Sequence, residues 1–218
     1  LRKVLLVRDY IASLEDGDIR DLFRLAFAAT MINYSNYSYE PSLSRRVTAG
    51  KQEIHNFQVG VEIAGKLQEM LADISLLQKT APNSVTAKVI NASFFDYADH
   101  LEPATVSLII TSPPYLNNYH YNRNTRPQLY WLGFVEGPSD MQPLEQANFG
   151  KYWQTVRGGE RLDLSFSLPG SDLPEKLDAL RQINPEKGLY GGSGWANYAA
   201  SYFNDCYRFA HGIKYALE

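Results

Sequence analysis

The sequence predicts an α/β protein in which part of a parallel sheet is flanked by helices and followed by a long irregular insertion. Two short runs of β-branched residues, 86–91 and 106–111, follow segments that have helical periodicity. The second run is almost entirely apolar, as expected of a strand that is buried on both faces of a parallel sheet. We therefore expect 86–91 and 106–111 to be adjacent parallel strands.

Helices are expected on both sides of these strands. Apolar residues recur at helical spacing in 18–32 and 60–79, and Asp18 is expected to cap the first of these helices. A short helix is expected at 173–183. The strongest pattern covers 195–217, where aromatic residues and alanines form one continuous apolar face. The rest of 117–194 is rich in proline and glycine and is expected to be irregular.

Composition limits the class of protein. The chain has 218 residues, of which 44% are hydrophobic and 21% charged, and these values are typical of a soluble globular protein. No apolar run is long enough to cross a bilayer, so no membrane partner is expected. The single cysteine, Cys206, excludes a disulfide framework and a multi-cysteine zinc site, and a cytoplasmic location fits best. The net charge of -3 gives no global basic field, so nucleic acid would have to be bound through a local patch.

The two ends favour a chain that is a piece of a longer protein. It begins with Leu1 rather than methionine, and it ends with Leu217–Glu218, a pair typical of a cloning remnant. The alternative, that both ends are native, stays open.

The most informative segment is Thr111–Tyr115, directly after the second predicted strand. Open α/β sheets bind ligands at the carboxyl ends of their strands. Pro113 and Pro114 fix φ twice and remove two backbone donors, while their carbonyl acceptors remain. Ser112 adds a hydroxyl acceptor and Tyr115 a flat ring. The loop therefore suits a planar group that carries an NH2, although Pro-Pro before a packed tyrosine is also common in ordinary loops.

An apolar strand followed by Ser-Pro-Pro-Tyr resembles the catalytic motif of the DNA amino-methyltransferases. That family transfers a methyl group from S-adenosylmethionine to the exocyclic nitrogen of cytosine or adenine. The resemblance extends over 107–119 and 89–95, and less firmly over 34–46, which is similar to bacterial members. It implies a Rossmann-like methyltransferase sheet with flanking helices.

The resemblance also implies roles for the residues of the motif. The Ser112 side chain and the Pro113 carbonyl would accept the two amino hydrogens, and Pro114 would complete the rigid loop. Tyr115 would stack on a base flipped out of the duplex. Serine at the first position favours cytosine over adenine as the target.

The resemblance divides the chain into three parts. Residues 1–132 would be the catalytic-loop part of a methyltransferase domain with N-terminal helices, and 195–218 a helix packing back on the catalytic domain. Residues 133–194 would be an irregular insertion, either a target-recognition region or a structural excursion specific to the family. The family's glycine loop for S-adenosylmethionine is absent, and 191–194 is interpreted as the flexible start of a helix. We therefore expect incomplete binding of S-adenosylmethionine, and an inactive isolated chain.

Double-stranded DNA is the expected partner, and a restriction endonuclease is the second partner that the resemblance implies. Basic and aromatic residues that lie just after the motif or in the tyrosine-rich segment are the predicted DNA contacts: Tyr119, His120, Arg123, Arg126, Arg45 and Arg46. Ordinary surface loops are the alternative for these residues.

Two other classes of function stay open. The loop is also similar to the Asn-Pro-Pro-Tyr loops of enzymes that methylate RNA bases or protein glutamine, although Ser112 disfavours the glutamine enzymes, whose loop normally begins with asparagine. A non-catalytic nucleic-acid-binding or specificity module is a further hypothesis. The acidic net charge disfavours such a module as a standalone binder.

Overall fold

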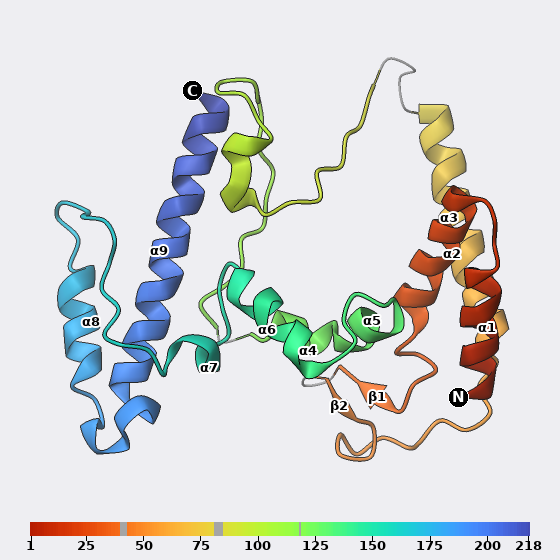
Figure 1. The fold of residues 1–218 in the computed structure, drawn as a ribbon, viewed down its shortest axis with the longest axis horizontal. Coiled ribbons are helices and arrows are strands. Elements are labelled where there is room, and N and C mark those ends of the chain that lie inside the picture. Colours follow the sequence, from red (N-terminus) through yellow and green to blue (C-terminus); the bar gives the residue numbers. More distant parts are fainter. Residues whose placement is uncertain (40–42, 81–84, 118) are drawn as a thin grey trace. The chain divides into compact units, whose positions relative to one another are not determined.

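The computed structural model describes residues 1–39, 43–80, 85–117 and 119–218 (Figure 1). The chain forms two compact units, which we describe separately. Unit 1 comprises residues 1–87 and 123–136, and unit 2 comprises 88–122 and 137–218. Helices dominate both units. Within the described ranges, the only strands are β1 (Tyr37–Ser38) and β2 (Ser44–Arg45), which pair antiparallel in unit 1.

Three helices build the core of unit 1: α1 (Arg2–Ala12), α2 (Gly17–Thr30) and α3 (Val59–Thr80). They lie side by side in Figure 1 and contact one another pairwise. Their apolar faces meet at a buried cluster that includes Ile11, Phe27 and Ile63. The short helix α5 (Arg126–Trp131) adds Trp131, whose ring meets Phe27 edge to face at 6.2 Å.

Unit 2 is built around one long helix, α9 (Gly192–Leu217). Its partners among the shorter helices are α7 (Trp153–Val156), α8 (Leu173–Arg181) and two 3-10 helices, η1 (Phe94–Asp99) and η2 (Pro185–Tyr190). Unit 2 also contains α6 (Pro138–Ala147), and α4 (Tyr121–Asn124) contains the boundary between the units. Small buried residues, Ala196, Ala199 and Ala200, let neighbouring elements approach α9 closely.

Backbone amides from another segment of unit 2 donate hydrogen bonds to carbonyls at the C-terminal end of α9. The amides of Ala104 and Val106 donate to the carbonyls of Tyr215 and Ala216, each at 3.0 Å. These carbonyls belong to the last helical turn and have no partner within the helix. A Cβ on Gly212 would lie 2.7 Å from ring atoms of Phe94 and Tyr97, so only glycine allows η1 to pack there.

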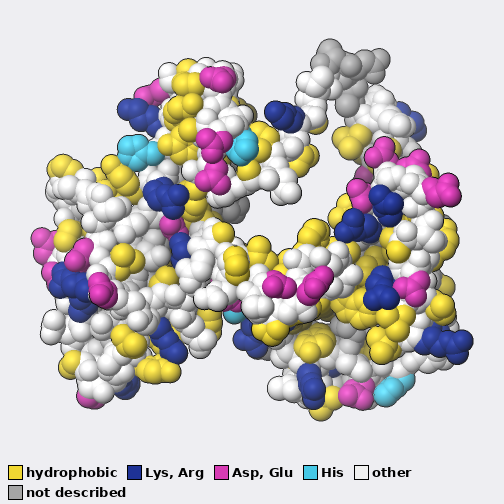
Figure 2. Space-filling model, in the orientation of Figure 1, with side chains coloured by type: hydrophobic (Ala, Val, Ile, Leu, Met, Phe, Trp, Pro, Cys, Tyr) yellow, Lys and Arg dark blue, Asp and Glu magenta, His cyan; other side chains and the backbone are white. Residues whose placement is uncertain are grey.

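The predicted α/β fold with a Rossmann-like sheet is wrong. Residues 86–91 and 106–111 form no strand in the described chain, and Val89, Leu108 and Ile110 are 92%, 72% and 89% exposed. Two strands without a covering layer are marginal, and the amide of Val106 is already bonded to α9. Figure 2 likewise shows hydrophobic side chains on the surface of both units.

The four helices predicted from the sequence are confirmed. Segments 18–32, 60–79, 173–183 and 195–217 correspond to α2, α3, α8 and α9. The cap of α2 is Asp16 rather than Asp18, because the Asp16 carboxylate accepts from the amides of Asp18 and Ile19.

The region after residue 116 is more helical than predicted. Helices α4 to α7 are only 4–10 residues long, too short to show a clear helical period in the sequence. Helices α5 and α6 begin with a proline in the first turn, which suits a helix start but also resembles a loop signal.

The glycines at the start of α9 are tightly packed. A Cβ on Gly192 would overlap the carbonyl oxygen of Leu180, and one on Gly194 would overlap that of Leu189. The amide of Gly192 donates to the Ile183 carbonyl at 2.8 Å. The interpretation of 191–194 as a flexible helix start is therefore replaced by one of close backbone packing.

We expect Gly192→Ala to lower the free energy of unfolding by about 1–3 kcal/mol, because the added methyl group must displace a packed backbone. Gly65→Ala is the control, since Gly65 lies in α3 with no atom within 4 Å of the added Cβ. That substitution should raise stability by about 0.5–1 kcal/mol. Urea unfolding followed by circular dichroism measures both changes, and equal effects would contradict the packing argument.

Candidate functional site

The Ser112–Tyr115 loop is irregular and is anchored in unit 2 through Pro114. The Tyr202 hydroxyl, on α9, donates to the Pro114 carbonyl oxygen at 3.0 Å. On another side lies Gly150, whose φ of +66° favours glycine and where an added Cβ would be 3.0 Å from the Pro114 ring. Pro114 is therefore held by a hydrogen bond and by close packing from residues distant in sequence.

The two residues before Pro114 keep their acceptors open. Ser112 and Pro113 are exposed, and the described residues offer no hydrogen-bond partner to the Ser112 hydroxyl or the Pro113 carbonyl. Tyr115 follows with 68% of its surface exposed, and its carbonyl accepts from the Asn117 amide at 2.9 Å. The loop thus presents two neighbouring acceptors and an accessible ring from a fixed point.

Burial keeps the Tyr202 hydroxyl protonated. Loss of hydration raises the pKa of Tyr202 to about 12, and a hydrogen bond with Cys206 acts in the same direction. Burial also raises the pKa of the Cys206 thiol. Both groups are therefore neutral at physiological pH, and Tyr202 remains a donor to the loop.

The predicted DNA contacts Tyr119 and His120 lie in unit 2. The His120 Nε2 atom is 2.8 Å from Glu145 Oε1, and both side chains are largely buried. The His120 ring also stacks on Tyr152 at 4.3 Å, and Tyr119 meets Tyr121 edge to face at 4.9 Å. His120 is thus engaged with an acid, which disfavours a direct phosphate contact.

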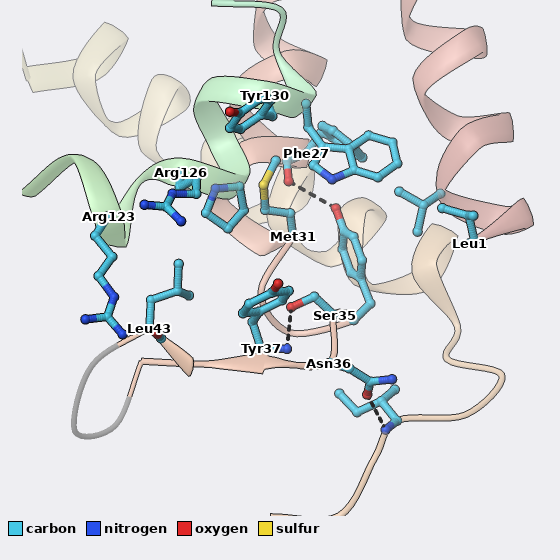
Figure 3. A pocket seen from close by; sticks show the side chains of 15 residues that line it. Leu1, Phe27, Met31, Ser35, Asn36, Tyr37, Leu43, Arg123, Arg126 and Tyr130 are labelled. Carbon is cyan, nitrogen blue, oxygen red and sulfur yellow. Dashed lines mark hydrogen bonds between the residues drawn. The ribbon is translucent and has the colours of Figure 1, made fainter. Parts of the chain in front are cut away.

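The predicted contacts Arg123 and Arg126 belong to unit 1, where they line a cavity of about 640 Å³ (Figure 3). Aromatic side chains, including Tyr37 and Tyr130, line the same cavity. Arg123 donates one bond to the Leu43 carbonyl at 3.3 Å. No local sequence pattern predicts this cavity, because its walls come from segments about 90 residues apart in the chain.

Arg45, the last residue of β2, and Arg46, which follows the strand, differ in their contacts. Arg45 is exposed, and the described chain provides no hydrogen-bond or ion-pair partner for its guanidinium. Arg46 donates from Nε to the Gln52 carbonyl at 2.8 Å, which closes the loop after β2. Arg45 is therefore available to a partner, whereas Arg46 is partly used within unit 1.

Binding of S-adenosylmethionine stays a prediction, to which no described residue is assigned. The glycine-rich segment 191–194 packs against the backbone that precedes α9. Among the described residues, no group of three or more His, Cys, Asp or Glu side chains is arranged to hold a metal ion. We assign no described residue to a cofactor.

Comparison with known proteins gives no relative: no protein-family model matches the chain, and neither a curated protein nor a solved structure is similar to it. No helix in the described part of the chain is both long and apolar enough to cross a membrane. Function must therefore be argued from the residues themselves.

We expect Tyr202→Phe to lower the free energy of unfolding at neutral pH by about 1 kcal/mol, because the Pro114 carbonyl loses its donor. The raised pKa of Tyr202 means that the folded state retains the phenol proton more strongly than the unfolded state. Its contribution to stability is therefore complete below pH 10 and is lost as the pH rises toward about 12.

Urea unfolding at several pH values tests this expectation. The loss of stability between pH 10 and about 12 should be smaller in Tyr202→Phe than in the unsubstituted protein. Tyr115→Phe is the control, since that ring is 68% exposed. Parallel stability curves for Tyr202→Phe and the unsubstituted protein would contradict the proposed state of Tyr202.

Proposed function

We propose that residues 112–115 are the catalytic loop of an S-adenosylmethionine-dependent DNA amino-methyltransferase, with cytosine favoured over adenine as the target base. One observation carries the proposal. Ser112 and Pro113 present unpaired acceptors next to Pro114, which Tyr202 and Gly150 hold in place. A rigid pair of acceptors beside an exposed aromatic ring suits a planar amine.

The chemistry of an aromatic amine explains why such acceptors are needed. The nitrogen lone pair is delocalised into the base, so the amine is a weak nucleophile. Ser112 Oγ and the Pro113 carbonyl would accept the two N–H bonds, raise the electron density on nitrogen and orient it. S-adenosylmethionine, when bound, would supply the methyl group: its methyl–sulfur bond would break, S-adenosylhomocysteine would leave, and the proton lost by the nitrogen would pass to solvent.

Tyr115 would hold the base by stacking. A base inside a duplex is not accessible, so the target nucleotide must be flipped out of the helix. The exposed Tyr115 ring offers a flat apolar surface for the flipped base. Positioning of the two substrates would then supply most of the remaining catalysis.

Double-stranded DNA is the proposed partner, a restriction endonuclease is a further proposed one, and the cytoplasm is the proposed location. The free guanidinium groups of Arg45 and Arg126 support a phosphate contact, since no described side chain pairs with either. The single cysteine supports a reducing compartment. Methylation of RNA bases or protein glutamine uses the same acceptor pair, and a substrate panel separates these activities.

We expect Ser112→Ala to lower kcat about ten- to a hundredfold while DNA affinity stays constant, because the lost hydrogen bond acts mainly in the transition state. Methylation assays with the complete gene product measure this change. Ser107→Ala is the matched control, an exposed serine of the same segment, and should keep full activity. Full activity in Ser112→Ala would show that the catalytic loop lies elsewhere.

Tyr115→Ala should weaken binding of the flipped base as well as slow methylation, since a stacked ring is worth about 1–3 kcal/mol per base. Tyr115→Phe retains the ring and should be tolerated. Fluorescence of a 2-aminopurine at the target position reports the flipped base directly. Equal losses in the two variants would contradict the stacking role.

We expect the 218-residue chain to bind S-adenosylmethionine weakly or not at all, because it lacks a glycine-rich cofactor loop. Calorimetric titration measures the affinity. Tight one-to-one binding would mean that residues not assigned above form the cofactor site.

A further inference from the structure

We propose that the cavity of unit 1 binds a nucleotide, with the base between aromatic side chains and the phosphate on Arg123 and Arg126. The proposal does not depend on methyl transfer by residues 112–115, which belong to unit 2. The cavity volume of about 640 Å³ is within the range of small-molecule sites and exceeds the needs of a single nucleotide.

One side of the cavity is positively charged. Figure 3 shows Arg123 and Arg126 on the same side, with Leu1 on the opposite side. Arg126 has no hydrogen-bond or ion-pair partner among the described residues, and Arg123 uses only Nη2 for the Leu43 carbonyl. No described lining residue is acidic. Two guanidinium groups that have no counter-ion among the described residues match a phosphate, which accepts paired hydrogen bonds from arginine.

The remaining walls suit a flat ring. Tyr37 and Tyr130 are 44% and 36% exposed, and no described residue bonds to their hydroxyls. Phe27 and Met31 are buried behind them and form an apolar floor. Tyr34 contributes a ring whose hydroxyl already donates to the Phe27 carbonyl at 3.0 Å. Stacking on such rings tolerates any base, because every base has a π-face.

The charge of the walls selects among aromatic ligands. A neutral nucleoside would leave both guanidinium groups without a partner. S-adenosylmethionine has one carboxylate, but its sulfonium and ammonium groups give it a net positive charge, which two arginines disfavour relative to a phosphate. A nucleotide can stack its base on the aromatic rings and place its phosphate on the arginines, whether it is free or is one unit of a single strand.

The test is calorimetric titration of the 218-residue chain at low salt. The probes are deoxycytidine monophosphate, deoxycytidine, S-adenosylmethionine and a ten-nucleotide single strand. We expect saturable binding of the monophosphate, the strand or both below about 1 mM. Binding of the nucleoside should be at least about tenfold weaker than that of the monophosphate. Binding by the strand alone would identify nucleic acid as the source of the nucleotide.

Variants locate the site. Arg126→Gln should weaken nucleotide binding about ten- to a hundredfold, since it removes a charge-assisted contact from an exposed position. Arg8→Gln is the matched control, because Arg8 lies on α1 outside the cavity and pairs only with Asp9. It removes the same charge and should leave affinity nearly unchanged.

Three results would overturn the proposal. The first is that neither phosphate-bearing probe binds saturably. The second is that the nucleoside binds with the same affinity as the monophosphate. The third is that Arg126→Gln and Arg8→Gln reduce nucleotide affinity by the same factor. If S-adenosylmethionine binds tightly and Arg126→Gln does not change its affinity, the cofactor site lies outside this cavity. That result would bear on the proposed methyltransferase function and would leave the nucleotide proposal standing.

Discussion

Unit 2 depends on close backbone contact with helix α9, and glycine makes that contact possible. At the start of the helix, a Cβ on Gly192 would overlap the carbonyl oxygen of Leu180, and a Cβ on Gly194 would overlap that of Leu189. Toward its end, Gly212 admits the rings of Phe94 and Tyr97. Side chains at these three positions would push α8, η2 and η1 away from α9. The close packing of these elements on α9 therefore requires glycine at each position.

The candidate catalytic loop inherits its position from the same helix. Tyr202 lies midway along α9, and its hydroxyl fixes the Pro114 carbonyl. The buried Lys151–Asp205 ion pair, at 2.9 Å, holds the chain just after Gly150 to the same part of α9. These contacts restrain the third residue of the loop and leave the acceptors of Ser112 and Pro113 open. A loop fixed at one point and open at the next is suited to orienting a small polar group.

Unit 1 uses aromatic packing to bring a distant segment to its helices. Trp131 packs on Phe27, while Gln128 donates to the Ala28 carbonyl and Arg24 to the Leu132 carbonyl. These contacts position Arg123 and Arg126 at the wall of the cavity near β1 and β2. The cavity therefore exists only because residues 123–136 fold with the N-terminal helices.

The sequence by itself determined the long helices, because an apolar face with a 3.6-residue period is a local property of α2, α3, α8 and α9. It also predicted a candidate site at Ser112–Tyr115, which stays a prediction. It misled at 86–91 and 106–111, since an apolar β-branched run does not specify a partner strand, and Val106 instead bonds to the end of α9. Tertiary structure alone decided that Arg123 and Arg126 share a cavity with Tyr37, that His120 pairs with Glu145, and that Tyr202 holds Pro114. Each of these is a contact between segments distant in the chain, and no local pattern encodes it.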